Sequence, residues 1–266
     1  MQDDRQVSLE GALAETEADA EAVLKAEAAV GKALKQFRTA AHVGNLRDLR
    51  PALDAAEKAV ADLQQRLAEA KENWDFDEEA YFSNGAYTRE LLEAAERMDV
   101  RVFEQDDRLY CYPSLIRVLP GERAVQIDKA RERRLRPSVL VAHLRDLQRR
   151  PARFKPEAFL ETLFSAYAAI VAKYGKDALS QARVERLSEV YELLTLLPGQ
   201  AREYSKQEFA RDVYLLDRSS VTMTRKGYQV GFPASTGTRS ASGTIRVITE
   251  RGQEKVYYGI SFSQTE

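Results

Sequence analysis

The feature that most constrains the fold is a heptad repeat in residues 46–74. Nine apolar residues follow one another here at alternating spacings of three and four residues: Leu46, Leu49, Leu53, Ala56, Val60, Leu63, Leu67, Ala70 and Trp74. A repeat that averages 3.5 residues keeps one apolar stripe of an α-helix facing a partner helix. The stretch is therefore predicted to form one helix of a coiled coil.

Residues 9–41 carry a weaker form of the same repeat, which Thr16 and Glu27 interrupt. Gly44 and Asn45 are predicted to end this first helix and begin the second, so the two helices fold back as an antiparallel hairpin. Such a hairpin is either part of a compact helical bundle or an arm that binds a protein partner or a second copy of the chain. The residues predicted to bind that partner are Leu49, Leu53, Val60, Leu63 and Leu67.

The rest of the chain mixes strand and helix patterns. Residues 99–128 contain short apolar runs separated by turn sequences, which predict a small antiparallel β-meander. Residues 137–198 return to helical periodicity. Ser205 and Glu208 match a capping box that opens one more helix, and strand-like segments follow from residue 221. Three helices followed by hairpins is the element order of a winged helix.

The predicted fold class is therefore α+β, in three segments. Residues 1–76 form the antiparallel coiled-coil hairpin. Residues 77–155 form a small α+β region with the meander and a basic helix. Residues 156–266 form a helical and β-hairpin domain that resembles a winged helix.

Charge is distributed unevenly along the chain. The net charge is -2, but residues 129–155, which we call the basic segment, contain 10 Lys and Arg against two acidic residues. Residues 1–80 contain 18 acidic residues against 10 basic ones. Arginines in such numbers suit phosphates or carboxylates, which accept paired hydrogen bonds from the guanidinium group. Three interpretations stay open: a nucleic-acid contact, which is favoured, an acidic protein surface such as the chain's own hairpin, and no partner.

A second set of basic residues lies on the helix that follows Ser205 and beside the loop of residues 233–243. In a winged helix, that helix would enter the DNA groove. That loop is predicted to be a wing tip; it lacks the Gly-Lys-Ser/Thr end of a phosphate-binding loop. The residues predicted to contact nucleic acid are Arg131, Arg133, Arg134, Arg136, Arg145, Arg149, Arg150, Arg153, Lys206, Arg211, Arg225 and Lys226.

No sequence motif names a reaction. Neither histidine belongs to a catalytic or zinc-binding motif, and Cys111 is expected to be a buried structural thiol. The acidic run of residues 75–79 is interpreted as the start of the next helix. No catalytic residue, metal ligand or cofactor is predicted, and an enzyme is not expected.

The favoured function is a non-catalytic accessory or scaffold subunit of a larger complex, whose hairpin binds protein and whose basic surfaces contact nucleic acid. One alternative is a pure protein–protein adaptor whose basic segment docks an acidic partner. A second alternative is a metal-dependent enzyme without a recognisable motif. Because the N-terminus lacks a secretory signal pattern and no apolar run is long enough to span a membrane, a cytoplasmic location without membrane contact is expected.

Overall fold

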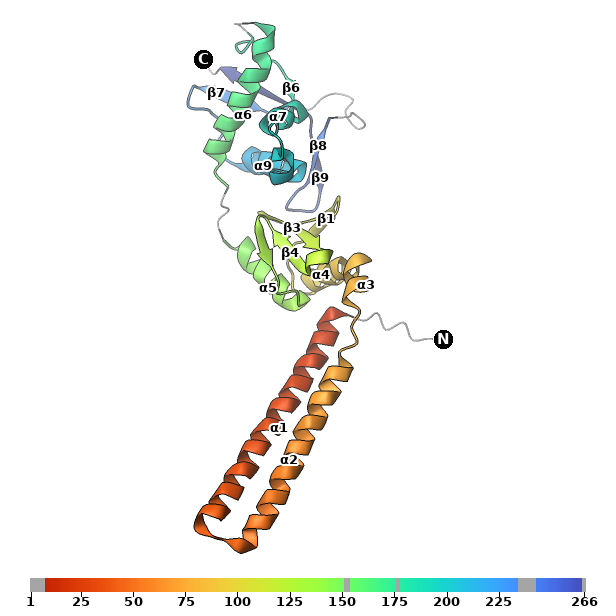
Figure 1. The fold of residues 1–266 in the computed structure, drawn as a ribbon. Helices are drawn as coiled ribbons and strands as arrows, with labels where there is room; N and C mark the ends of the chain where they lie inside the picture. Colours follow the sequence, from red (N-terminus) through yellow and green to blue (C-terminus); the bar gives the residue numbers. More distant parts are fainter. Residues whose placement is uncertain (1–7, 151–153, 176–177, 234–242, 265–266) are drawn as a thin grey trace, which may run out of the picture. The chain divides into compact units, whose positions relative to one another are not determined.

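The computed structural model describes residues 8–150, 154–175, 178–233 and 243–264. The chain is a mixture of helices and small antiparallel sheets, as predicted, and divides into two compact units (Figure 1). The first unit comprises residues 1–100 and 118–145, and the second comprises residues 101–117 and 146–266. Within the described residues, no helix has the length and apolar character needed to cross a membrane.

The predicted helical hairpin is confirmed and belongs to the first unit. It consists of α1 (Leu9–Val43) and α2 (Leu46–Asn73) (Figure 1). Ser8 and Asn45 cap the two helix N-termini with their side chains, which accept hydrogen bonds from backbone N–H groups. Gly44 ends α1 with a φ of 69°, a left-handed conformation that glycine adopts without steric cost.

Alanines form the centre of the contact between α1 and α2. The buried residues there are Ala26, Ala33 and Ala40 on α1 and Ala56 on α2. Small side chains let the two helices approach closely, and the larger residues of the heptad repeat are then divided between two faces. Leu49 and Leu63 are half-buried, whereas Leu46, Leu53, Val60, Leu67 and Trp74 are exposed. The internal contact of the hairpin therefore leaves these five residues of the repeat exposed.

The remainder of the first unit packs around a small core of its own. Its elements are α3 (Glu78–Ser83), α4 (Ala86–Arg97), β4 (Ala124–Ile127), β5 (Ala130–Glu132) and α5 (Pro137–Gln148). Asp77 caps α3, so the acidic run begins a helix. The fully buried side chains of this core are those of Tyr87, Leu91, Val125, Leu140, Val141 and Leu144.

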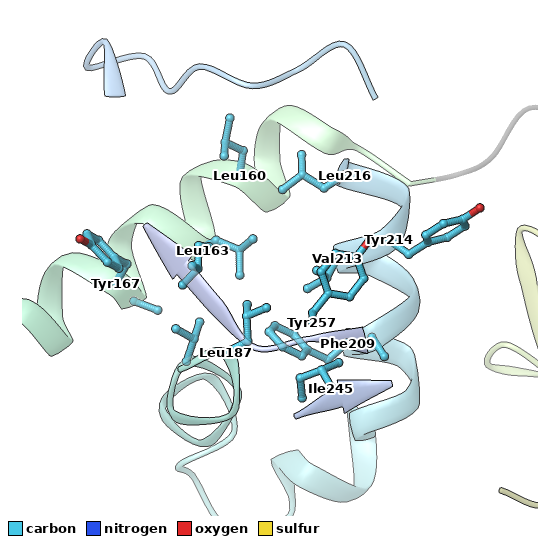
Figure 2. Close-up of a cluster of buried hydrophobic side chains, with 14 of the residues drawn as sticks. Leu160, Leu163, Tyr167, Leu187, Phe209, Val213, Tyr214, Leu216, Ile245 and Tyr257 are labelled. Atoms are coloured by element: carbon cyan, nitrogen blue, oxygen red, sulfur yellow. The ribbon is translucent and has the colours of Figure 1, made fainter. Parts of the chain in front are cut away.

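The second unit is built on helices that share one apolar core. These are α6 (Pro156–Val171), α7 (Leu187–Leu194) and α9 (Lys206–Arg218), whereas the short α8 (Gln200–Glu203) has no buried residue. The predicted capping box at Ser205 and Glu208 opens α9 and is confirmed. Figure 2 shows side chains from α6, α7 and α9 meeting two strand residues, Ile245 and Tyr257, in this core.

The strands of the second unit form separate antiparallel groups. β1 (Phe103–Gln105), β2 (Arg108–Cys111) and β3 (Ser114–Leu119) pair in chain order. A three-stranded sheet has the order β6-β10-β7, and a hairpin joins β8 to β9. Their bounds are β6 (Glu185–Arg186), β7 (Tyr228–Gly231), β8 (Ile245–Ile248), β9 (Glu254–Tyr257) and β10 (Gly259–Gln264). At Tyr258 the chain thus passes from β9 to β10, which belong to different sheets.

Candidate functional site: the helical hairpin

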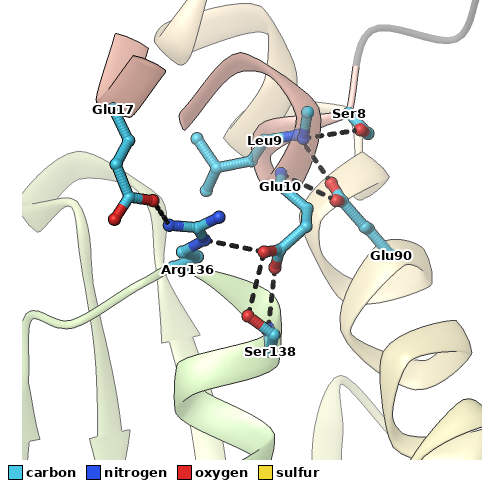
Figure 3. A network of polar contacts seen from close by, with 8 residues as sticks. Ser8, Leu9, Glu10, Glu17, Glu90, Arg136 and Ser138 are labelled. Carbon is cyan, nitrogen blue, oxygen red and sulfur yellow. Dashed lines mark hydrogen bonds and ion pairs between the residues drawn. The ribbon is translucent and has the colours of Figure 1, made fainter. Parts of the chain in front are cut away.

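The N-terminus of α1 is held by a buried carboxylate on α4. The side chain of Glu90 accepts hydrogen bonds from the backbone N–H groups of Leu9, at 2.8 Å, and Glu10, at 2.9 Å (Figure 3). The hydroxyl of Tyr81 donates to the same carboxylate. The first N–H groups of a helix have no partner inside it, and the helix dipole favours a negative charge there. Glu90 therefore fastens the hairpin to the rest of the first unit.

Arg136, in the basic segment, makes the second connection to the hairpin. Its guanidinium donates to Glu10, at 2.7 Å, and to Glu17, at 2.5 Å (Figure 3). Ser138 also donates to Glu10, from both its backbone N–H and its hydroxyl, each at 2.9 Å. Burial by itself would raise the pKa of Glu10, but the hydrogen bonds from Ser138 and Arg136 outweigh it and hold the pKa below its ordinary value.

Other arginines of the basic segment in the first unit also contact carboxylates close by. Arg131 lies 3.0 Å from Glu122, and Arg134 lies 2.5 Å from Glu132. The pKa of Glu132 falls to about 2, chiefly because of the hydrogen bonds from Arg134. Together with Arg136, these residues show that carboxylates of the same chain take up part of the positive charge.

Two predicted residues of the first unit differ from this pattern. Arg133 is exposed, and among the described residues no ion pair is found for it. Arg145 is half-buried, and its Nε atom has no hydrogen-bond partner within the described part of the chain.

A row of exposed apolar side chains follows α2 at intervals of seven residues. The exposed fractions are 80% for Leu46, 48% for Leu53, 38% for Val60, 59% for Leu67 and 36% for Trp74. We call these five residues the apolar stripe. Of the residues predicted to bind a partner, Leu53, Val60 and Leu67 belong to the stripe, whereas Leu49 and Leu63 lie half-buried on the side of α2 that carries Ala56.

Helix α1 adds exposed leucines to the same face of the hairpin. On each helix one exposed leucine comes directly after an alanine on the contact side: Leu34 follows buried Ala33, and Leu53 follows half-buried Ala52. One residue rotates a helix by about 100°, and because the two helices are antiparallel the rotations turn both side chains toward one face. Leu24, also exposed, lies at the outer edge of that face. The matching positions of the opposite face are Asp48, Ala55, Asp62 and Glu69 on α2, and they include Lys25 and Lys32 on α1.

In the second unit, the helix predicted to contact nucleic acid is covered by the β8–β9 hairpin. Asp217 on α9 accepts hydrogen bonds from Lys255, at 2.5 Å, and from the hydroxyl of Tyr257, at 2.7 Å. Arg218 pairs with Glu250 at the turn of the same hairpin. These contacts leave α9 without the free face that entry into a DNA groove needs.

The predicted nucleic-acid-binding residues of the second unit differ in exposure and in pairing. Arg211 pairs with neighbouring Asp212 at 2.9 Å, and its side chain is only 15% exposed. Arg153 and most of the predicted wing-tip loop, residues 234–242, lie outside the described residues. The predicted residues that are exposed in this unit are Arg149, Arg150, Lys206, Arg225 and Lys226.

The described residues contain no group of three or more His, Cys, Asp or Glu side chains placed to hold a metal ion. Cys111 is buried, as expected. Comparison with protein-family models, with curated proteins and with solved structures finds no match. The arrangement is therefore interpreted from its own geometry.

The sequence patterns did not predict the contacts that hold the N-terminus of α1. Glu90 lies in an ordinary helical stretch, and its role depends on a contact 81 residues away along the chain. The heptad pattern also does not identify Leu24 and Leu34 as exposed residues, for a different reason. A heptad frame shifted by one position assigns Leu34 to the covered side and Ala33 to the exposed side, the reverse of the structure.

Proposed function

We propose that the chain is a non-catalytic accessory subunit that binds a helical protein partner through the exposed face of its hairpin. The observation that carries the proposal is the apolar stripe: four large apolar residues of α2 and Trp74 at its C-terminal cap, spaced by seven, remain exposed. Contiguous apolar patches of this kind on a soluble protein mark interaction sites.

The spacing also indicates the kind of partner. Side chains at intervals of seven residues lie in a line along a helix and fit between the side chains of a second helix with the same repeat. A partner helix along the stripe would cover Leu53, Val60 and Leu67 in the middle of the contact. Residues near the centre of an interface contribute most of its binding free energy.

The test is the capture of partners by the tagged full-length chain in the cells that produce it. A variant with Leu53→Asp and Leu67→Asp places two charges on the stripe. The matched control has Ala55→Asp and Gln65→Asp, at exposed positions of α2 outside the stripe. We expect partners retained by the wild type and the control to be lost from the stripe variant. Equal retention by all three proteins would contradict the proposal, provided that circular dichroism shows equal helix content.

Contact with nucleic acid is a second candidate function, supported by the topology of the second unit. Helices α6, α7 and α9 precede β7 and β10, and β10 lies between β6 and β7 in the sheet. This arrangement is consistent with the winged-helix-like domain that the sequence predicts. Because α9 is covered, the contact would use exposed residues such as Arg149, Arg150 and Lys206 as phosphate-binding groups rather than a helix that reads bases.

A salt titration tests this second candidate. If the chain neutralises several phosphates, the logarithm of its affinity for generic duplex DNA or RNA falls with the logarithm of salt concentration with a slope of several units. Charge reversal at Arg133, Arg149 and Arg150 should reduce that slope, while reversal at paired Arg134 should change it little. An affinity that is absent or independent of salt would exclude the candidate.

A further inference from the structure

We propose that the helical partner is a second copy of this chain, bound antiparallel about a two-fold axis that passes the hairpins at Val60. This inference rests on the proposed function and names its partner. It is argued from the common level of the exposed side chains on the two helices and from the apolar area of the face that they form.

The apolar stripe is symmetric about its middle residue. Leu53 and Leu67 lie seven residues before and after Val60, and Leu46 and Trp74 lie fourteen residues before and after it. A two-fold axis at Val60 therefore places Leu53 against Leu67 of the second copy and Leu46 against Trp74. In such an isologous contact, residue i of each copy contacts residue j of the other copy. The same stripe therefore forms both sides of the interface.

The exposed leucines of α1 have the same centre. The midpoint of Leu24 and Leu34 is residue 29, which lies 15 residues before Gly44, and Val60 lies 15 residues after Asn45. Because the turn joins two antiparallel helices of equal rise per residue, positions 29 and 60 lie at one level of the hairpin. The axis that pairs the α2 residues therefore also brings Leu24 to the level of Leu34 of the second copy, with Leu24 turned about 80° farther from α2.

The same axis gives a role to a glycine inside α1. Glycine in the middle of a helix costs about 1 kcal/mol relative to alanine. A Cβ atom added to Gly31 would meet no atom within 4 Å, so contacts inside the hairpin do not require this glycine. Glu27 and Gly31 lie two residues on either side of position 29, so the axis places the Glu27 side chain of each copy over Gly31 of the other, where the missing side chain leaves room.

The size of the face is sufficient for a stable pair. Two copies together would bury the exposed parts of about fourteen large apolar side chains, an area on the order of 1,000 Å² or more, which a specific interface requires. The opposite faces of both hairpins, which carry charges of both signs, would remain in solvent.

Cysteine cross-linking of the full-length chain tests both the contact and its direction. Cys111 is the chain's only cysteine and is buried, so a substituted cysteine supplies the accessible thiol. With a short bis-maleimide, Val60→Cys should form a covalent dimer, because the axis brings the two copies of residue 60 together. Leu53→Cys and Leu67→Cys should each react poorly alone, since each lies about 20 Å from its own copy at 1.5 Å per residue. Mixed together, they should cross-link at least about tenfold more than either alone, and Ala55→Cys is the control outside the stripe.

Sedimentation equilibrium supplies the second readout. The wild type and the Ala55→Asp, Gln65→Asp control should be dimers, and the Leu53→Asp, Leu67→Asp variant should be a monomer. A monomeric wild type, or efficient cross-linking of Leu53→Cys with itself, would overturn the proposal. If that wild-type monomer still captures partners that the stripe variant loses, only self-pairing fails; if it captures none, the proposed function fails as well.

Discussion

Arg136 connects the helical hairpin with the small fold that carries it. Its guanidinium binds Glu10 and Glu17 of α1, while Ser138 and Glu90 hold the first turn of the same helix. Each bond is modest, but they belong to one charged network in which Glu10 and Glu90 each accept several hydrogen bonds, while Glu17 accepts one from Arg136 (Figure 3). The orientation of α1 within the first unit thus depends on a few side chains rather than on a large apolar contact.

The network predicts a stability difference that depends on pH. The folded state lowers the pKa of Glu10, so its ionised form contributes stability above the pKa it has when unfolded, and this contribution is lost as the pH falls through the lower folded value. We expect Glu10→Gln to lower the free energy of unfolding by about 1 kcal/mol at pH 7 and by much less at pH 3.

Urea denaturation at the two pH values measures this difference. Glu17→Gln is the control, because the Glu17 side chain is 61% exposed and its ion pair should contribute less. An equal loss of stability at both pH values for Glu10→Gln would show that the carboxylate does not act through its charge.

At the scale of the elements, the contact between α1 and α2 is made by alanines, and the larger apolar side chains of the hairpin therefore remain exposed. With Ala26, Ala33, Ala40 and Ala56 in the centre, the hairpin closes without using its larger apolar residues. The residues of the apolar stripe therefore take no part in the contact between α1 and α2 and stay exposed. In the second unit the β8–β9 hairpin packs against α9 in the apolar core, and of the α9 residues only Lys206, Asp217 and Arg218 remain exposed.

Enlarging one of these alanines should open the hairpin. Ala56 is 4% exposed, so Ala56→Leu has no space in the contact and should lower the free energy of unfolding by about 1–3 kcal/mol. Its neighbour Ala55 is exposed, and Ala55→Leu should change the free energy of unfolding by about 0.5 kcal/mol or less. Thermal and urea denaturation of both variants measure the difference. Equal effects would contradict the alanine-centred contact.

The heptad repeat predicted the hairpin, and Gly44 predicted its turn, because both depend on local backbone chemistry. The same repeat did not reveal which leucines are covered, since a frame shifted by one residue fits the sequence nearly as well. The contacts of Arg136 and Glu90, and the cover that β9 provides for α9, join residues far apart in the chain. Such contacts have no local signal, so only the structure could reveal them.

At the scale of the whole molecule, the two units present different kinds of surface. The first unit exposes an apolar face and neutralises several of its arginines with its own carboxylates. The second unit buries its predicted contact helix and exposes scattered basic residues. This distribution favours a subunit whose main attachment is to protein, with nucleic acid as a further candidate partner.

The fluorescence of Trp74 tests the central claim most directly. Trp74 is the only tryptophan in the chain, it belongs to the apolar stripe, and it is 36% exposed. If the stripe is the docking face, raising the concentration of the protein or adding a captured partner should shift the emission of Trp74 to shorter wavelength and reduce its quenching by acrylamide. The Leu53→Asp, Leu67→Asp variant should show neither change. Association that leaves the emission and quenching of Trp74 unchanged would contradict the claim that the stripe is the docking face.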